Sequence, residues 1–501
     1  MTMLSRILGL VRDVVVASYF GASANADAFF VAFKIPNFMR RLFAEGAFAQ
    51  AFVPVLSEYR TQRDHRAVKD LLNRVAGTWG TVLVGFTAFA VLCAPYVAAL
   101  FAPGFYMEGG AKFDLAVDML RITFPYLLLI SMTAFAGSVL NSYGRFAVPA
   151  FTPVLLNVTL IGSAVFLSPL FDPPILAMAW GVLIAGLVQF MFQLPFLSHL
   201  KLVPKPIYDR KDEGVRRIYK LMLPAMFGVS VTQINLLLDT VLASFLETGS
   251  VSWLYYSDRL AELPLGVFGI AIATVILPSL SRKHASASRE QFSATLDWAI
   301  RMVLLIGVPA GVALFLLAAP MITTLFHYGE LTGHDVERAS LSLQAYACGV
   351  IAFMLIKVLA TGYFSRQDTA TPVKIGIQAS VANMVFNLLL IGPFAHVGLA
   401  AATSMSAFMN AGLLFWGLKK SGVLVVQKGW GMTFLRIATA NGLMAATLVY
   451  LAKPDADWLT WGVYERVSEV AILVGAGLLA YLVGLWVTGL RPRHLKPAVV
   501  A

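Results

Sequence analysis

The sequence predicts an all-α polytopic membrane protein, and its composition and its apolar runs both point there. Of its 501 residues, 58% are hydrophobic and only 13% are charged, and the mean hydropathy is +0.76. Soluble domains have about 25% charged residues. Apolar runs of roughly 20 residues, long enough to cross about 30 Å of hydrocarbon, recur along the whole chain. These observations exclude a soluble enzyme and a disordered scaffold.

Fourteen apolar segments are long enough to be transmembrane helices. They are 2–22, 25–56, 71–102, 115–140, 147–168, 174–199, 214–245, 250–280, 293–326, 336–364, 371–391, 397–418, 432–452 and 463–489. The loops on the side of the two termini contain 24 lysines and arginines, whereas the opposite loops contain two, Lys112 and Lys453. The positive-inside rule therefore predicts cytoplasmic N- and C-termini. The same loops explain most of the net charge of +11, so we expect no nucleic-acid partner.

The two halves of the chain resemble each other. Three pairs of segments match at offsets of 226, 224 and 223 residues: 13–19 with 239–245, 47–57 with 271–281, and 147–149 with 370–372. Shared membrane composition is the alternative explanation. A six-helix repeat keeps both copies in the same orientation, as parallel repeats related by an axis along the membrane normal. We predict an N-lobe, a cytoplasmic linker, a C-lobe, and two further helices with a cytoplasmic tail, over 1–199, 200–213, 214–420 and 421–501.

Several predicted helices contain charged residues that are costly in a membrane. Segment 2–22 contains Arg6, Arg12 and Asp13. Each Arg or Asp at a helix centre costs about 2.5–3.5 kcal/mol, whereas each Leu or Ile gains only about 0.3–0.6 kcal/mol. Groups inside the protein must therefore solvate these charges.

The second and eighth segments are also charged. In segment 25–56, Asn37, Arg41 and Glu45 follow at i, i+4 and i+8 on one helix face, with Arg40 beside them. In segment 250–280, Asp258, Arg259 and Glu262 lie close together, and Arg259 can pair with Glu262 at i+3.

Two interpretations of these charges remain open. They can be ion pairs that fix helix register, or the arginines can line a water-filled substrate path. Arg6, Arg12, Arg40 and Arg259 outnumber the nearby acids, and arginine suits bidentate binding of phosphate. The second interpretation predicts a site for an anionic headgroup.

A second group of polar residues could bind a cation. Asp239 could face Asn383 and Asn387, which are spaced i, i+4, and Thr403 on the next segment. Carboxylate and amide oxygens suit a hard cation, so sodium or a proton could be a coupling ion here. An interhelical hydrogen-bond cluster is the alternative.

No catalytic motif is present in the sequence. It contains no HExxH, no GxxxxGK[ST] and no GxSxG, and its seven histidines lie in loops or at segment ends. We predict no enzyme activity, no cofactor and no metal beyond the coupling cation.

Several stretches closely resemble one transporter family. They are 5–13, 24–37, 40–54, 250–262 and 363–374, and they are similar to MurJ (MviN), the lipid II flippases of the multidrug/oligosaccharidyl-lipid/polysaccharide exporter superfamily. The resemblance implies fourteen helices, two lobes around a V-shaped cavity, and a lipid-tail groove formed by the last two helices. It also implies that the diphosphate meets Arg6, Arg12, Arg40 and Arg259, with Asp27 and Glu262 also needed. In some relatives a sodium site lies where Asp239, Asn383, Asn387 and Thr403 fall.

The function expected from this resemblance is lipid flipping in a bacterial inner membrane. Lipid II, the undecaprenyl-diphosphate-linked MurNAc-pentapeptide-GlcNAc, would move from the cytoplasmic to the periplasmic leaflet by alternating access. This step would serve peptidoglycan synthesis and cell shape, and we expect a monomer whose only other partners are membrane lipids. The alternatives are a flippase for another undecaprenyl-diphosphate-linked oligosaccharide, a cation-coupled drug exporter, and a membrane enzyme that acts on prenyl diphosphates.

Overall fold

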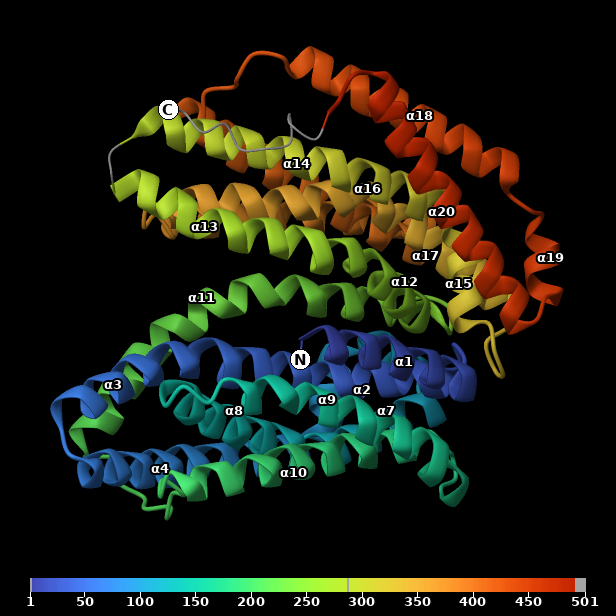
Figure 1. The fold of residues 1–501 in the computed structure, drawn as a ribbon. Coiled ribbons are helices and arrows are strands. Elements are labelled where there is room, and N and C mark those ends of the chain that lie inside the picture. The colour runs from blue at the N-terminus through green and yellow to red at the C-terminus, as the bar shows by residue number, and fades with distance from the viewer. Residues whose placement is uncertain (1, 286–287, 492–501) are drawn as a thin grey trace. The chain divides into compact units, whose positions relative to one another are not determined.

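The computed structural model describes residues 2–285 and 288–491 (Figure 1). All regular secondary structure in these two ranges is helical, so the predicted all-α class is confirmed. The chain divides into two compact units, residues 1–252 and 253–501, called unit 1 and unit 2 below. The division falls inside a helix, three residues after its start, and the lobe boundaries of the sequence analysis stay predictions.

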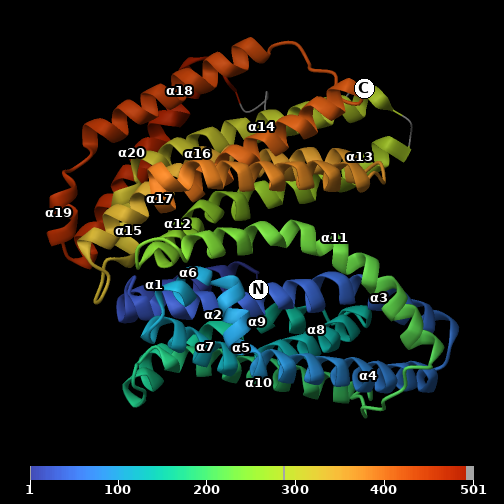
Figure 2. The same cartoon turned by 180° about the vertical axis from the view of Figure 1, so that it is seen from behind.

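Unit 1 consists of helices that are joined mostly by short turns. They are α1 (Thr2–Phe20), α2 (Ala24–Arg40), η1 (Arg41–Phe48), α3 (Ala49–Gln62), α4 (His65–Leu92), α5 (Ala94–Phe101), α6 (Pro103–Glu108), α7 (Ala111–Thr123), α8 (Tyr126–Ser142), α9 (Ala147–Gly162), η2 (Ser163–Leu167), η3 (Ser168–Leu170), α10 (Leu176–His199) and α11 (Glu213–Ala243). Figure 2 shows the same helices from behind.

The remaining helices belong to unit 2, apart from the first turn of α12. They are α12 (Ser250–Pro264), η4 (Leu265–Gly269), α13 (Ile270–Ala285), α14 (Arg289–Leu316), α15 (Ala318–Phe326), α16 (Gly333–Phe364), α17 (Ala370–Lys420), α18 (Trp430–Leu451), α19 (Asp455–Thr460) and α20 (Val463–Val487). The backbone of α17 leaves helical geometry at Ala395, where φ is 48°. This kink separates the two predicted segments 371–391 and 397–418.

Ten helices of the described chain are long and apolar enough to cross a membrane. The kinked α17 is one of them and corresponds to two predicted segments. The three predicted segments without a counterpart among the ten are 2–22, 25–56 and 214–245, which contain several charged residues each. The predicted count of fourteen is therefore not confirmed: segment 2–22 contains three charged residues, segment 25–56 is divided at η1, and segment 214–245 includes side chains outside the described residues.

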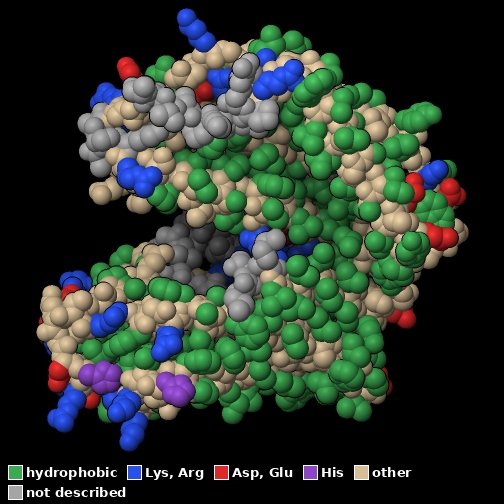
Figure 3. All heavy atoms as spheres, viewed as in Figure 1, with side chains coloured by type: hydrophobic (Ala, Val, Ile, Leu, Met, Phe, Trp, Pro, Cys, Tyr) green, Lys and Arg blue, Asp and Glu red, His purple; other side chains and the backbone are tan. Residues whose placement is uncertain are grey.

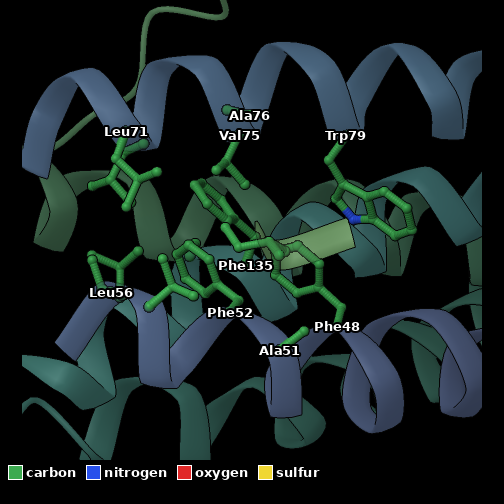
Figure 4. Packing of buried hydrophobic residues seen from close by; sticks show 14 of the residues in the cluster. Phe48, Ala51, Phe52, Leu56, Leu71, Val75, Ala76, Trp79 and Phe135 are labelled. Atoms are coloured by element: carbon green, nitrogen blue, oxygen red, sulfur yellow. The ribbon is translucent and has the colours of Figure 1, made fainter. Parts of the chain in front are cut away.

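Aromatic side chains form much of the core of unit 1 (Figure 4). The ring of Phe48 in η1 stacks on Trp79 of α4 with 5.4 Å between centroids, and Phe52 of α3 lies 5.2 Å from Phe135 of α8. All four side chains are buried. This packing holds η1 and α3 between α4 and α8, and so fixes the part of the chain that follows Arg40.

The linker after α10 is bound along α4. The amide of Ile207 donates to the carbonyl of Asn73 at 2.9 Å, and the amide of Lys205 donates to Asn73 Oδ1 at 2.7 Å. A Cβ atom on Gly77 would lie 2.3 Å from the Ile207 backbone, so only glycine allows this close approach. The linker is therefore part of unit 1.

The surface fits a protein surrounded by lipid. In Figure 3, hydrophobic side chains cover large parts of the visible face of each unit, and lysines and arginines gather at the end of unit 1 where α3 and α4 meet. Exposed apolar side chains on membrane-length helices are expected in hydrocarbon, where the hydrophobic effect does not bury them.

Candidate functional site

The arginine and the aspartate in the middle of α1 are solvated by protein groups. Arg12 is 7% exposed and Asp13 is 2% exposed. The Nε and Nη2 atoms of Arg12 donate to Asp13 Oδ1 at 3.0 and 2.6 Å. Arg12 Nη1 donates to Asn157 Oδ1 of α9 at 3.0 Å. The interior of unit 1 thus compensates these charges, as the insertion cost requires.

Arg6 and Arg40 lie in the same unit. Arg6 is half-buried on α1, and six residues place it about 120° around the helix from Arg12. Arg40 is half-buried at the end of α2, where its Nε donates to Asn37 Oδ1 at 3.3 Å. Asn37 in turn donates to the carbonyl of Phe33 at 3.0 Å.

The predicted face formed by Asn37, Arg41 and Glu45 does not have regular α-helical spacing. Residues Arg41–Phe48 form a π-helix, η1, whose wider turn changes the positions that share a face. The side chain of Glu45 lies outside the described residues, and so does any ion pair between Glu45 and Arg41.

Asp27 of α2 is buried against the start of α12. It is 1% exposed, and its carboxylate accepts hydrogen bonds from the amides of Gly249 and Ser252 at 2.7 and 3.0 Å and from the Ser252 hydroxyl at 2.7 Å. Lys112 Nζ lies 3.4 Å from Asp27 Oδ2. A carboxylate at the first turn of a helix compensates its unpaired amides and its dipole. In this geometry Asp27 joins α2, the start of α7 and the first turn of α12, and its contact with a substrate stays a prediction.

In unit 2, Arg259 and Glu262 form the predicted i, i+3 pair on α12. Arg259 Nη1 lies 3.6 Å from Glu262 Oε2, and their side chains are 37% and 56% exposed. Arg259 Nη2 also donates to the Tyr255 hydroxyl at 3.2 Å, and its guanidinium lies over the Tyr255 ring. An exposed pair contributes only about 0.2–1 kcal/mol, so its partners can be exchanged for a ligand at little cost.

Three of the four predicted cation-site residues lie together in α17. Asn383 and Asn387 are buried; Asn387 Nδ2 donates to Asn383 Oδ1 at 3.1 Å, and Asn383 Nδ2 lies 3.4 Å from Thr403 Oγ1. Asp239 lies in α11, which belongs to unit 1. Across the described residues, no group of three or more His, Cys, Asp or Glu could hold a metal ion. Within unit 2 the geometry fits the hydrogen-bond cluster, the alternative left open above.

Several contact residues carry no signal that the sequence analysis used. Asn157, Lys112 and Ser252 hold charged residues that are up to 225 positions away in the chain. Tyr255 is only four positions from Arg259, so helix spacing could have indicated that contact. A single asparagine in the apolar segment 147–168 was the available signal for Asn157, because a polar side chain in hydrocarbon needs a partner.

Comparison with known proteins gives matches along nearly the whole chain. The family model described as "Lipid II flippase MurJ" matches residues 16–467. A Vibrio cholerae protein named "Probable lipid II flippase MurJ" is 52% identical, over 99% of this chain and 96% of its own. A Burkholderia cenocepacia protein named "Lipid II flippase MurJ" is 40% identical, over 99% and 97% of the two chains.

Solved structures agree with this result. "Lipid II flippase MurJ, inward closed conformation" superposes with a TM-score of 0.82 at 28% identity and covers 97% of both chains. An inward-facing multidrug resistance MATE family transporter of the MOP superfamily superposes with a TM-score of 0.71 at 15% identity, over 84% of this chain and 96% of its own. The second likeness shows a shared fold alone.

Proposed function

The chain belongs to the lipid II flippase MurJ family, and from that premise we propose that it moves lipid II from the cytoplasmic to the periplasmic leaflet of a bacterial inner membrane. The observation that carries the proposal is the match to flippases at 40–52% identity over 99% of the chain. No covalent bond is made or broken in this transport, so the protein works as a transporter. We propose that it acts as a monomer, with both termini in the cytoplasm.

The headgroup of lipid II requires cationic partners in a region that is otherwise apolar. Arg6 and Arg12 on α1 and Arg40 at the end of α2, in unit 1, and Arg259 on α12, in unit 2, provide guanidinium groups. A guanidinium binds phosphate oxygens with two parallel N–H groups, which gives both charge and orientation. In this proposal the diphosphate is bound by these arginines while the prenyl chain stays in lipid.

The present partners of the arginines suggest how binding occurs. Arg259 is paired with a half-exposed glutamate at 3.6 Å, a weak interaction that the diphosphate can replace. Arg12 is buried against Asp13 and held at two places, so we propose that it supplies a fixed donor direction. Alternating access then requires that the bound headgroup becomes accessible first from the cytoplasmic side of the membrane and then from the periplasmic side.

A coupling cation, either sodium or a proton, is also part of the proposal. Asp239 would supply the charge, and Asn383, Asn387 and Thr403 would supply uncharged oxygens. A carboxylate together with amide and hydroxyl oxygens suits a hard cation.

Binding by the purified full chain in nanodiscs tests this function. We expect lipid II to bind more tightly than an undecaprenyl-diphosphate-linked oligosaccharide without a pentapeptide. Arg259→Ala should weaken lipid II binding roughly tenfold or more, because a hydrogen bond to a charged group contributes about 1.5–3 kcal/mol. Arg121→Ala, which removes an exposed arginine paired with Asp118, is the matched control.

Two results would change the proposal. Equal affinity for the two lipids would favour the alternative of a flippase for another lipid-linked oligosaccharide. Unchanged lipid II binding by Arg259→Ala, at normal protein level, would contradict an arginine site for the headgroup.

A further inference from the structure

We propose that Asn157 is a positioning residue for the headgroup site, which fixes the guanidinium of Arg12 and holds α9 against α1. This inference rests on the proposed function, because it assigns to Asn157 a role in lipid II binding through Arg12. It concerns a residue far from the charged segments in sequence, 145 positions from Arg12.

Both ends of the Asn157 amide are used. Its Oδ1 accepts a hydrogen bond from Arg12 Nη1 at 3.0 Å, and its Nδ2 donates to the carbonyl of Ser5 at 3.0 Å. A backbone carbonyl can only accept, so Nδ2 must face Ser5 and Oδ1 must face Arg12. Asn157 is 5% exposed, and water therefore competes little for either bond.

The residues of α1 that lie next to Asn157 are spaced so that they share one side of the helix. Ser5, Gly9 and Arg12 follow at i, i+4 and i+7, which places them on one side of the helix. A Cβ atom on Gly9 would lie 3.7 Å from Asn157 Nδ2. That distance is an ordinary van der Waals contact, so the Asn157 amide packs directly against this face of α1.

The arrangement fixes the plane of the guanidinium. Nε and Nη2 of Arg12 both donate to one oxygen of Asp13. The Asn157 bond is made by the other terminal nitrogen, Nη1, so the two contacts together fix the orientation. Bidentate phosphate recognition depends on this orientation, and precise sites need such supporting residues.

A double-mutant cycle separates this role from packing. Lipid II affinity of the full chain in nanodiscs would be measured for Asn157→Leu, Arg12→Ala and the double variant. We expect Asn157→Leu to weaken binding roughly tenfold alone, and less than about twofold when Arg12 is already alanine. Asn73→Leu, which removes another buried asparagine of unit 1, one whose Oδ1 accepts from the amide of Lys205, is the matched control and should leave the affinity unchanged.

Two results overturn the inference. An equal effect of Asn157→Leu in both backgrounds means that Asn157 acts without Arg12. A lower Tm with unchanged affinity means that it only packs α9 against α1. If Asn157→Leu does not reach the membrane, Asn157→Ser, which is too short to span both partners, has the same expected result.

The proposed function fails in a distinguishable way. If Arg12→Ala leaves lipid II affinity unchanged, Arg12 is not a headgroup residue, and both the assigned site and this inference are wrong. If Arg12→Ala weakens binding and Asn157→Leu does not, the inference alone is wrong.

Discussion

Asp27 illustrates how a single buried carboxylate can organise several helices. Its oxygens accept from two amides and one hydroxyl at the first turn of α12, and Lys112 lies 3.4 Å away. The side chain of Lys112 is 9% exposed. Burying such a pair is costly, so removing one partner leaves an uncompensated charge behind.

Replacing Asp27 should therefore destabilise the protein. We expect Asp27→Ala to lower the apparent Tm of the full chain in detergent by several degrees, since breaking a buried pair costs on the order of 3–5 kcal/mol. The double variant Asp27→Ala/Lys112→Met should recover part of the loss, because it removes the orphaned charge. Asp118→Ala, at an exposed pair, serves as the control. A Tm equal to wild type for Asp27→Ala would show that the contacts with α12 contribute little.

Local spacing decided which residue contacts could be predicted. Arg259 and Glu262 are three positions apart, so their pairing follows from helix geometry. The bond between Arg12 and Asn157 joins two segments 145 positions apart, and no local pattern encodes it. The charges that need a partner were visible in the sequence, but most of their partners were not.

At the scale of helices, several segments depart from the continuous spans that hydropathy predicts, and two of them are interrupted at equivalent places of the repeat. Segment 25–56 is divided into α2, η1 and α3, and segment 250–280 into α12, η4 and α13. Both interruptions are π-helical, and Arg41 and Leu265, which begin them, are separated by the repeat offset of 224. A π turn adds a residue without changing composition, so hydropathy could not reveal it.

The orientation of the helices is testable with introduced cysteines. In a variant without Cys93 and Cys348, Glu108→Cys and Glu330→Cys should react with a membrane-impermeant thiol reagent added outside the inner membrane. His65→Cys and Tyr208→Cys should react only after permeabilisation. All four positions are exposed, so differences in labelling report the side of the membrane. The reverse pattern would contradict the positive-inside assignment.

For the molecule as a whole, composition and charge bias were enough to predict the class of protein. Low charge and recurrent apolar segments predict a helical membrane protein, and the sequence motifs point to its family. The place where the chain divides into its two compact units was not predicted. Residues 1–252 form one compact unit that includes α11, and packing of α11 against η1 and α3 is a tertiary property that the repeat pattern does not contain.

The most direct measurement of the central claim is the leaflet distribution of lipid II in cells depleted of this protein. In the depleted cells, lipid II should accumulate in the cytoplasmic leaflet, where an impermeant probe in the periplasm cannot reach it. Wild-type protein and Arg121→Ala should restore its appearance outside, whereas Arg259→Ala at the same membrane level should not. If lipid II reaches the periplasmic leaflet at the normal rate in depleted cells, this protein is not the flippase that the account describes.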